Sequence, residues 1–129
     1  MRPFLTVAAV LAWLFGTALL VAPAGFYAPA GIVITPMVAT IAQAHGATLV
    51  GLGVIDWMSR SATPSNARAV LAGNLVVQIL SLGVVVRTMT LGAGAAVAPG
   101  VVIHIVLGSL FWFFLVRSAG KSANVERAQ

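Results

Sequence analysis

The sequence contains no cysteine and very few charged residues. Only two acidic and seven basic side chains occur in 129 residues, so that 7% of the chain is charged. Soluble domains carry roughly 25% charged residues, and this chain therefore has too few to cover a water-facing surface. The absence of cysteine excludes disulfides, thiolate metal sites and thiol nucleophiles. Disordered segments are rich in charge and poor in apolar residues, which excludes disorder as well.

The apolar residues, which make up 60% of the chain, gather in four long runs at about 4–21, 37–57, 69–87 and 100–117. A helix needs about 20 apolar residues to cross the ~30 Å hydrocarbon layer of a membrane. Backbone polar groups must be satisfied inside lipid, and a helix satisfies its own. The sequence therefore predicts an all-α integral membrane protein, a four-helix bundle with short loops that forms a single domain over residues 1–129.

The basic residues predict the orientation of these spans. If the N-terminus is cytoplasmic, one side of the membrane collects six of the seven: Arg2, Arg60, Arg68, Arg117, Lys121 and Arg127. Only Arg87 lies on the other side. By the positive-inside rule, we expect both termini of this multi-pass protein to be cytoplasmic. The net charge of +5 does not indicate nucleic-acid binding, because the basic residues form no cluster that could follow a phosphate backbone.

An alternative for the first span is a cleaved secretory signal. Arg2, a long apolar run and Ala22-Pro23-Ala24 before Gly25 imitate such a signal with its A-x-A cleavage site. Three spans would then remain. The apolar run is longer than the usual 7–15 residues of a signal peptide, which favours a retained span.

Small residues recur at helical spacing and predict helix packing. Because lipid tails are as apolar as the helices, close backbone approach drives helix association in membranes. Three pairs lie four residues apart: Ala12 and Gly16, Ala42 and Gly46, and Ala47 and Gly51. The last span contributes a single glycine, Gly108. These small residues predict packing within the chain or a face for another subunit.

Three polar residues inside the spans form a candidate cofactor-binding site: His45, Gln78 and His104. Two imidazoles from different helices could ligate a haem or a chlorophyll-type pigment, or bind a quinone carbonyl. In the alternative interpretation both histidines are neutral and join helices by hydrogen bonds to Gln78, Ser81 or a backbone carbonyl. His104, Gly108 and Trp112 are four residues apart and lie along one face of the last span. This face could hold a flat ligand beside Gly108, or its large side chains could face lipid.

The sequence predicts no catalytic site and no metal site. Its two carboxylates, Asp56 and Glu126, are far apart in sequence and give no acid–base pair. No Ser-His-Asp constellation, phosphate-binding loop or zinc ligand set occurs. We expect Asp56 to pair with Arg60, four residues later, in a headgroup-exposed position.

Residues 44–60 carry a resemblance to a known group of proteins. Their sequence is AHGATLVGLGVIDWMSR, a glycine-rich helix that ends in a tryptophan and a basic residue. It resembles the second helix of small four-span bacterial membrane proteins loosely grouped as DoxX-like. Some DoxX-type proteins are associated with quinone-linked oxidoreductases, so the resemblance implies a place beside an electron-transfer complex and no catalytic residue.

Together these features predict a non-catalytic accessory or scaffold subunit of a membrane complex. Its expected partners are the lipid bilayer and other membrane subunits or a second copy, with no nucleic acid. A module that binds haem, pigment or quinone through His45 and His104 is the alternative. A channel or carrier for small solutes comes third, since the inner half of the spans offers little polar surface beyond Asn74 and Asp56.

Overall fold

The chain is helical, as its composition predicts. The computed structural model describes the backbone of residues 1–126 and the side chains of residues 1–63, 65–91 and 96–120. Helices make up 90% of the chain, and no strand occurs in the part that is described. The all-α prediction is therefore confirmed.

Four long helices correspond to the four apolar runs. They are α1 (Arg2–Val21), α3 (Pro36–Ser59), α4 (Pro64–Thr88) and α5 (Ala98–Glu126). The helix α4 begins five residues before the expected span, and α5 continues well past residue 117, where the sequence suggests a frayed tail. The expected cytoplasmic charges of Lys121 and Arg127 lie outside the described side chains.

Threonine–proline pairs set the start of two helices. The Thr35 hydroxyl accepts a hydrogen bond from the Val38 amide at 3.3 Å, and the Thr63 hydroxyl accepts one from the Asn66 amide at 3.4 Å. A proline follows each threonine at the first helical position, where its missing N–H costs nothing. The cap at Thr63 explains why α4 begins ahead of its apolar run.

Short helical turns connect the long helices. Between α1 and α3 lie α2 (Pro23–Tyr27) and the 3-10 turn η1 (Ala28–Ala30). Gly31 follows with φ of 67°, a left-handed conformation that glycine adopts without a Cβ clash. Between α4 and α5 lie the π-helical turn η2 (Met89–Ala93) and the 3-10 turn η3 (Gly94–Val97).

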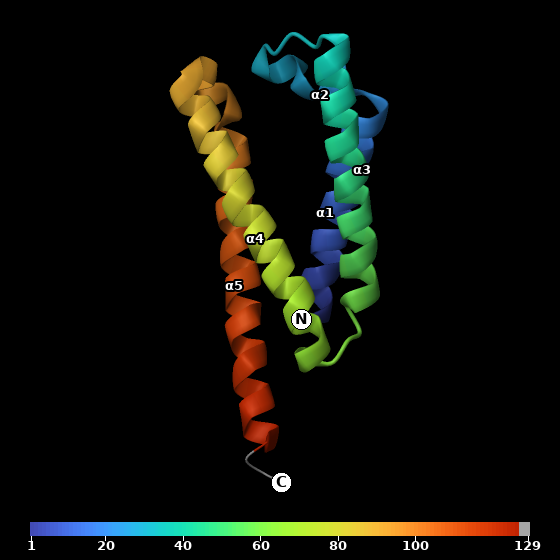
Figure 1. Cartoon of the computed structure of the whole chain (residues 1–129), viewed down its shortest axis with the longest axis vertical. Helices are drawn as coiled ribbons and strands as arrows, with labels where there is room; N and C mark the ends of the chain where they lie inside the picture. The colour runs from blue at the N-terminus through green and yellow to red at the C-terminus, as the bar shows by residue number, and fades with distance from the viewer. Residues whose placement is uncertain (127–129) are drawn as a thin grey trace. The chain divides into compact units, whose positions relative to one another are not determined.

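The chain divides into two compact units, each built on a pair of long helices (Figure 1). The first hairpin, Met1–Arg60, packs α1 against α3. The second hairpin, Ser61–Gln129, packs α4 against α5. Each hairpin has its own contacts and is described by itself, and the single-domain arrangement stays a prediction.

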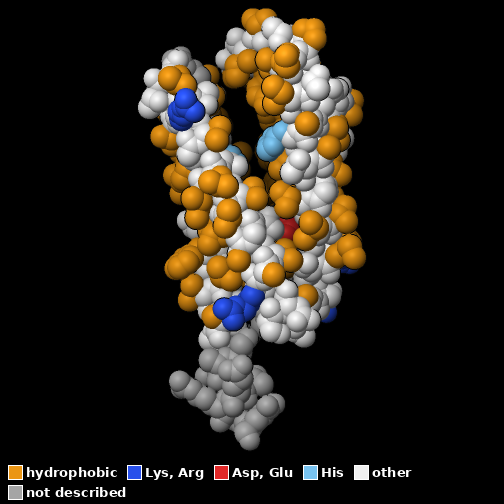
Figure 2. Space-filling view, viewed as in Figure 1, with side chains coloured by type: hydrophobic (Ala, Val, Ile, Leu, Met, Phe, Trp, Pro, Cys, Tyr) orange, Lys and Arg blue, Asp and Glu red, His pale blue; other side chains and the backbone are white. Residues whose placement is uncertain are grey.

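All four long helices are long and apolar enough to cross a membrane. The qualifying segments are Arg2–Val21, Pro36–Ser59, Ser65–Leu91 and Ala98–Gly120. Figure 2 shows hydrophobic side chains along the length of both hairpins, and arginine side chains towards the helix ends on the face in view. Each hairpin therefore presents an apolar outer surface.

Candidate functional sites in the two hairpins

The first hairpin is joined by a close backbone approach between two glycines. A Cβ added at Gly46 would lie 2.7 Å from the Gly16 carbonyl oxygen, and one added at Gly16 would lie 2.8 Å from the Gly46 carbonyl oxygen. Both separations are too short for a real Cβ, and the atoms met are backbone. Only glycine fits at either position in this packing.

A second contact lies seven residues away from the first on each helix. A Cβ at Gly53 would lie 2.5 Å from the Trp13 ring and 3.0 Å from the Ala9 carbonyl oxygen. Gly46 contacts Gly16, and Gly53, seven residues later on α3, contacts Ala9, seven residues earlier on α1. The two helices are therefore antiparallel, and their contacts repeat every seven residues. Trp13 also packs against Trp57, with ring centroids 5.5 Å apart.

The remaining small residues of the first hairpin fall on different faces. Ala42 is buried with Gly46 on the α1-facing side of α3, and Ala12 is half-buried. Ala47 and Gly51 are exposed instead, and a Cβ added at Gly51 meets no atom within 4 Å. The structure does not assign Ala47 and Gly51 to the α1–α3 contact, and a role against another helix stays a prediction.

Gln43 makes a polar contact that the sequence does not single out. Its side-chain amide donates to the Leu20 carbonyl oxygen on α1 at 3.1 Å. His45 lies two residues later, about 160° further round the helix at the usual 100° per residue, and its side chain is exposed. Gln43 lies three residues before Gly46, on the side of α3 that faces α1, so helical spacing could have selected it over His45 as the residue that contacts α1. The spacing could not have identified the Leu20 carbonyl oxygen as its partner.

In the second hairpin, His104 and Gln78 join α5 to α4. His104 Nδ1 lies 2.8 Å from the Gln78 Oε1 atom. An amide carbonyl oxygen only accepts hydrogen bonds, so His104 donates to it through Nδ1–H. This is the interhelical hydrogen bond that the sequence offers as one interpretation of His104.

The residues around this pair are close-packed. A Cβ added at Gly108 would lie 3.4 Å from the Gln78 Cβ, an ordinary van der Waals contact. Gln78 is 9% exposed, and Asn74, one turn earlier, is 5% exposed and donates to the Val70 carbonyl oxygen. Gly108 therefore lies against α4 itself, and Trp112, 59% exposed, faces outward.

Of the three candidate cofactor-binding residues, the structure brings two together. Gln78 and His104 are bonded in the second hairpin, whereas His45 belongs to the first. A pairing of the two histidines stays a prediction. No group of three or more His, Cys, Asp or Glu that could bind a metal occurs among the described residues.

The expected environment of Asp56 is wrong. Asp56 is 2% exposed and shares the buried face of α3 with Ala42, Gly46 and Gly53, since it follows Gly53 by three residues. Arg60 lies beside the ring of Trp57. Its guanidinium carbon lies 3.7 Å from the centre of the Trp57 ring, and Nη1 donates to the Trp57 carbonyl oxygen.

Comparisons of the chain with protein-family models, with curated proteins and with solved structures find no match.

Proposed function

We propose that the chain is a non-catalytic accessory or scaffold subunit of a bacterial inner-membrane complex. Its four long apolar helices would cross the bilayer, with both termini in the cytoplasm. In each hairpin the positive-inside rule gives the same orientation. In the first hairpin Arg2 and Arg60 lie at one end. In the second hairpin Arg68 and Arg117 lie at the end opposite Arg87.

The observation that supports a scaffold role is the open small-residue surface of α3. Ala47 and Gly51 are exposed, one turn apart, beside the exposed apolar side chain of Ile55. The Gly16–Gly46 contact is an example within this chain of what such residues do when a second helix approaches. Small residues at four-residue spacing let helix backbones come close in lipid, so this face would receive a helix of another subunit.

The absence of native cysteine makes a direct test clean. Single-cysteine variants Ala47→Cys and Gly51→Cys would be treated with a short bifunctional thiol–amine cross-linker in native membranes. Gly83→Cys is the matched control. A Cβ added at Gly83 also meets no atom within 4 Å, but the residues four positions away, Ile79 and Arg87, are large and would keep another helix at a distance. We expect a cross-linked product from positions 47 and 51 and much less from 83.

The mass of that product distinguishes another subunit from a second copy. Gly51→Leu should remove the complex while leaving a helical protein of normal yield. Equal cross-linking at all three positions, or an unchanged complex in Gly51→Leu, would contradict the proposal.

A second candidate is a module that binds haem, pigment or quinone, and one observation favours it. The Gln78 carbonyl oxygen accepts the Nδ1–H of His104, which orients the ring. Ligating histidines in metal sites are oriented in the same way by an acceptor on the other nitrogen. His45 would supply the second imidazole.

An ultraviolet–visible spectrum of the protein purified from its native membrane in mild detergent tests this candidate. A visible band that disappears in His104→Ala or His45→Ala would establish a tetrapyrrole site. A blank spectrum, together with an organic extract that contains no quinone, would rule the candidate out.

A further inference from the structure

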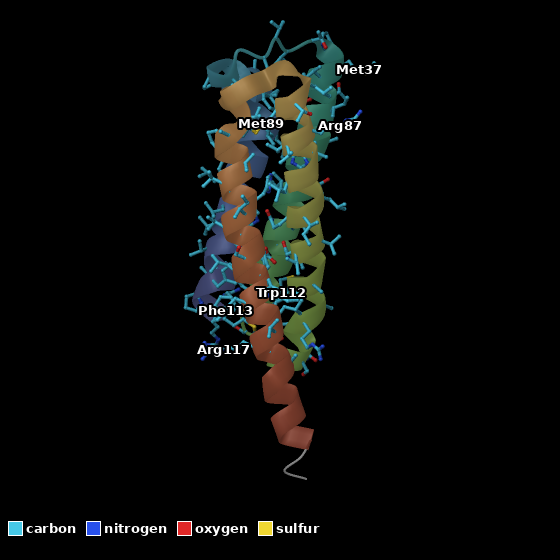
Figure 3. All side chains as sticks on the ribbon, turned by 90° about the vertical axis from the view of Figure 1, so that its left-hand side faces the viewer. Met37, Arg87, Met89, Trp112, Phe113 and Arg117 are labelled. Atoms are coloured by element: carbon cyan, nitrogen blue, oxygen red, sulfur yellow. The ribbon has the colours of Figure 1, made fainter. Side chains whose placement is uncertain are left out.

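The middle of α5 carries an exposed groove in which an arginine lies beside aromatic rings. Its lining residues are Trp112, Phe113, Val116 and Arg117, all from α5 (Figure 3). Phe113 and Val116 are 51% and 53% exposed, so each of the apolar side chains presents half or more of its surface. The Arg117 guanidinium carbon lies 5.9 Å from the centre of the Phe113 ring.

We propose that this Trp112–Arg117 groove binds an anionic phospholipid. The headgroup phosphate would pair with Arg117, and an acyl chain would lie along Trp112, Phe113 and Val116. The position along the helix fits this arrangement. From Ala98 to Arg117 the helix rises about 28 Å at 1.5 Å per residue, which brings Arg117 to the boundary of a ~30 Å hydrocarbon layer.

The chemistry of Arg117 favours a phosphate. Its side chain makes no hydrogen bond or ion pair within the described part of the chain, and its contact with Phe113 is near the ~6 Å limit for a cation–π interaction. A guanidinium presents five N–H donors in a planar fork that matches two phosphate oxygens. Arg117 therefore has donors available for an anionic headgroup.

The shape of the groove favours a lipid over a soluble ligand. It is shallow, and one helix supplies its whole lining. Sites for soluble small molecules usually enclose 70–90% of the ligand surface, which an open groove of this kind does not do. A phospholipid needs no such enclosure, because the bilayer itself covers the rest of its acyl chains.

Arg68 provides a matched control. It is an exposed arginine near the start of α4, at the same end of the second hairpin as Arg117. Among the described residues no aromatic ring lies under its guanidinium, whereas Arg60 and Arg117 each have one. Arg68 thus has the charge of Arg117 without the groove.

The experiment measures lipid retention by native mass spectrometry of the full-length protein in mild detergent. Dioleoyl phosphatidylglycerol and dioleoyl phosphatidylcholine are the anionic and zwitterionic probes. We expect the wild type to retain the anionic lipid preferentially. Arg117→Gln should weaken this retention by about fivefold, the effect of one basic residue at an anionic surface. Arg68→Gln should leave it nearly unchanged.

A second measurement reports on the groove itself and does not depend on Arg117 variants. Brominated phosphatidylglycerol should quench the tryptophan emission of the wild type more than that of Trp112→Phe, and brominated phosphatidylcholine should show a smaller difference. If Arg117→Gln and Arg68→Gln lose retention of the anionic lipid equally, the lipid responds to the total positive charge and not to the groove, and the proposal is overturned. Equal retention of the two lipids, or no quenching of Trp112, would overturn it as well.

Discussion

In the first hairpin, α1 and α3 meet backbone to backbone at Gly16 and Gly46, whereas in the second hairpin α4 and α5 meet through the side chains of Gln78 and His104. Two helices that are equally apolar on all sides gain little hydrophobic energy from each other in lipid. Close packing and interhelical hydrogen bonds remain as sources of association. This chain uses mainly the first in one hairpin and the second in the other.

The difference predicts which substitutions each hairpin tolerates. A backbone contact cannot adapt to an added methyl group, since the atoms that would have to move belong to the helices themselves. A side-chain hydrogen bond depends instead on keeping a donor and an acceptor.

The largest effect is expected for Gly46→Ala. The new Cβ would lie 2.7 Å from the Gly16 carbonyl oxygen, so the helices must separate. We expect the free energy of unfolding to fall by about 1–3 kcal/mol, the usual cost of overpacking a well-packed contact. Thermal unfolding in mild detergent, followed by circular dichroism at 222 nm, measures it.

Gly51→Ala is the matched control for this prediction, because its Cβ meets nothing within 4 Å. Its free energy of unfolding should stay within about 0.5 kcal/mol of the wild type. If the two variants lose equal stability, the cause is helix propensity or the bilayer environment, and the close approach of α1 and α3 is not the determinant.

A smaller effect is expected for the hydrogen bond of the second hairpin. In a double-mutant cycle of Gln78→Leu and His104→Leu, we expect a coupling of about 0.6–1.7 kcal/mol, the range from average to maximum measured for interhelical hydrogen bonds in a membrane protein. Denaturant unfolding of the four proteins in mixed micelles provides the values. A cycle of Ser81→Ala with His104→Leu is the control, and a coupling of the same size there would show that the Gln78 bond is not specific.

The smallest effect is expected for Arg60→Gln at the end of α3. Its guanidinium carbon lies 3.7 Å from the centre of the Trp57 ring, and such exposed cation–π contacts contribute about 0.5–1 kcal/mol. The variant should lose about that much stability and change the fluorescence emission of Trp57. An emission spectrum identical to that of the wild type would show that Arg60 does not lie over the ring in solution.

Much of the fold follows from the sequence, because its main signals are local. The four apolar runs predict four helices, and Thr63 with Pro64 indicates the start of α4. The length of α5 is missed because the sequence becomes polar after Arg117, and polarity marks the end of an apolar run rather than the end of a helix. Among the residues that follow, Ala119, Lys121, Ala123 and Glu126 are of types that favour a helix.

The faces of the helices are harder to predict. The helices are apolar around most of their circumference, so no amphipathic stripe shows which side is inside. Ala42 with Gly46 and Ala47 with Gly51 give the same local signal, and only the first pair lies on the face toward α1. The burial of Asp56 is missed for the same reason. A seven-residue spacing from Gly46 to Gly53, matched by Ala9 and Gly16, is the signal that could have selected the correct face.

The glycine contact also has a consequence for conformational entropy. Side chains such as leucine lose about 0.5–1 kcal/mol of rotamer freedom when they are buried, whereas glycine has no side chain to immobilise. Gly16 and Gly46 therefore bring α1 and α3 together without that cost at their closest point. At the point where the two glycines meet, neither glycine has a side chain that must be ordered for α1 and α3 to associate.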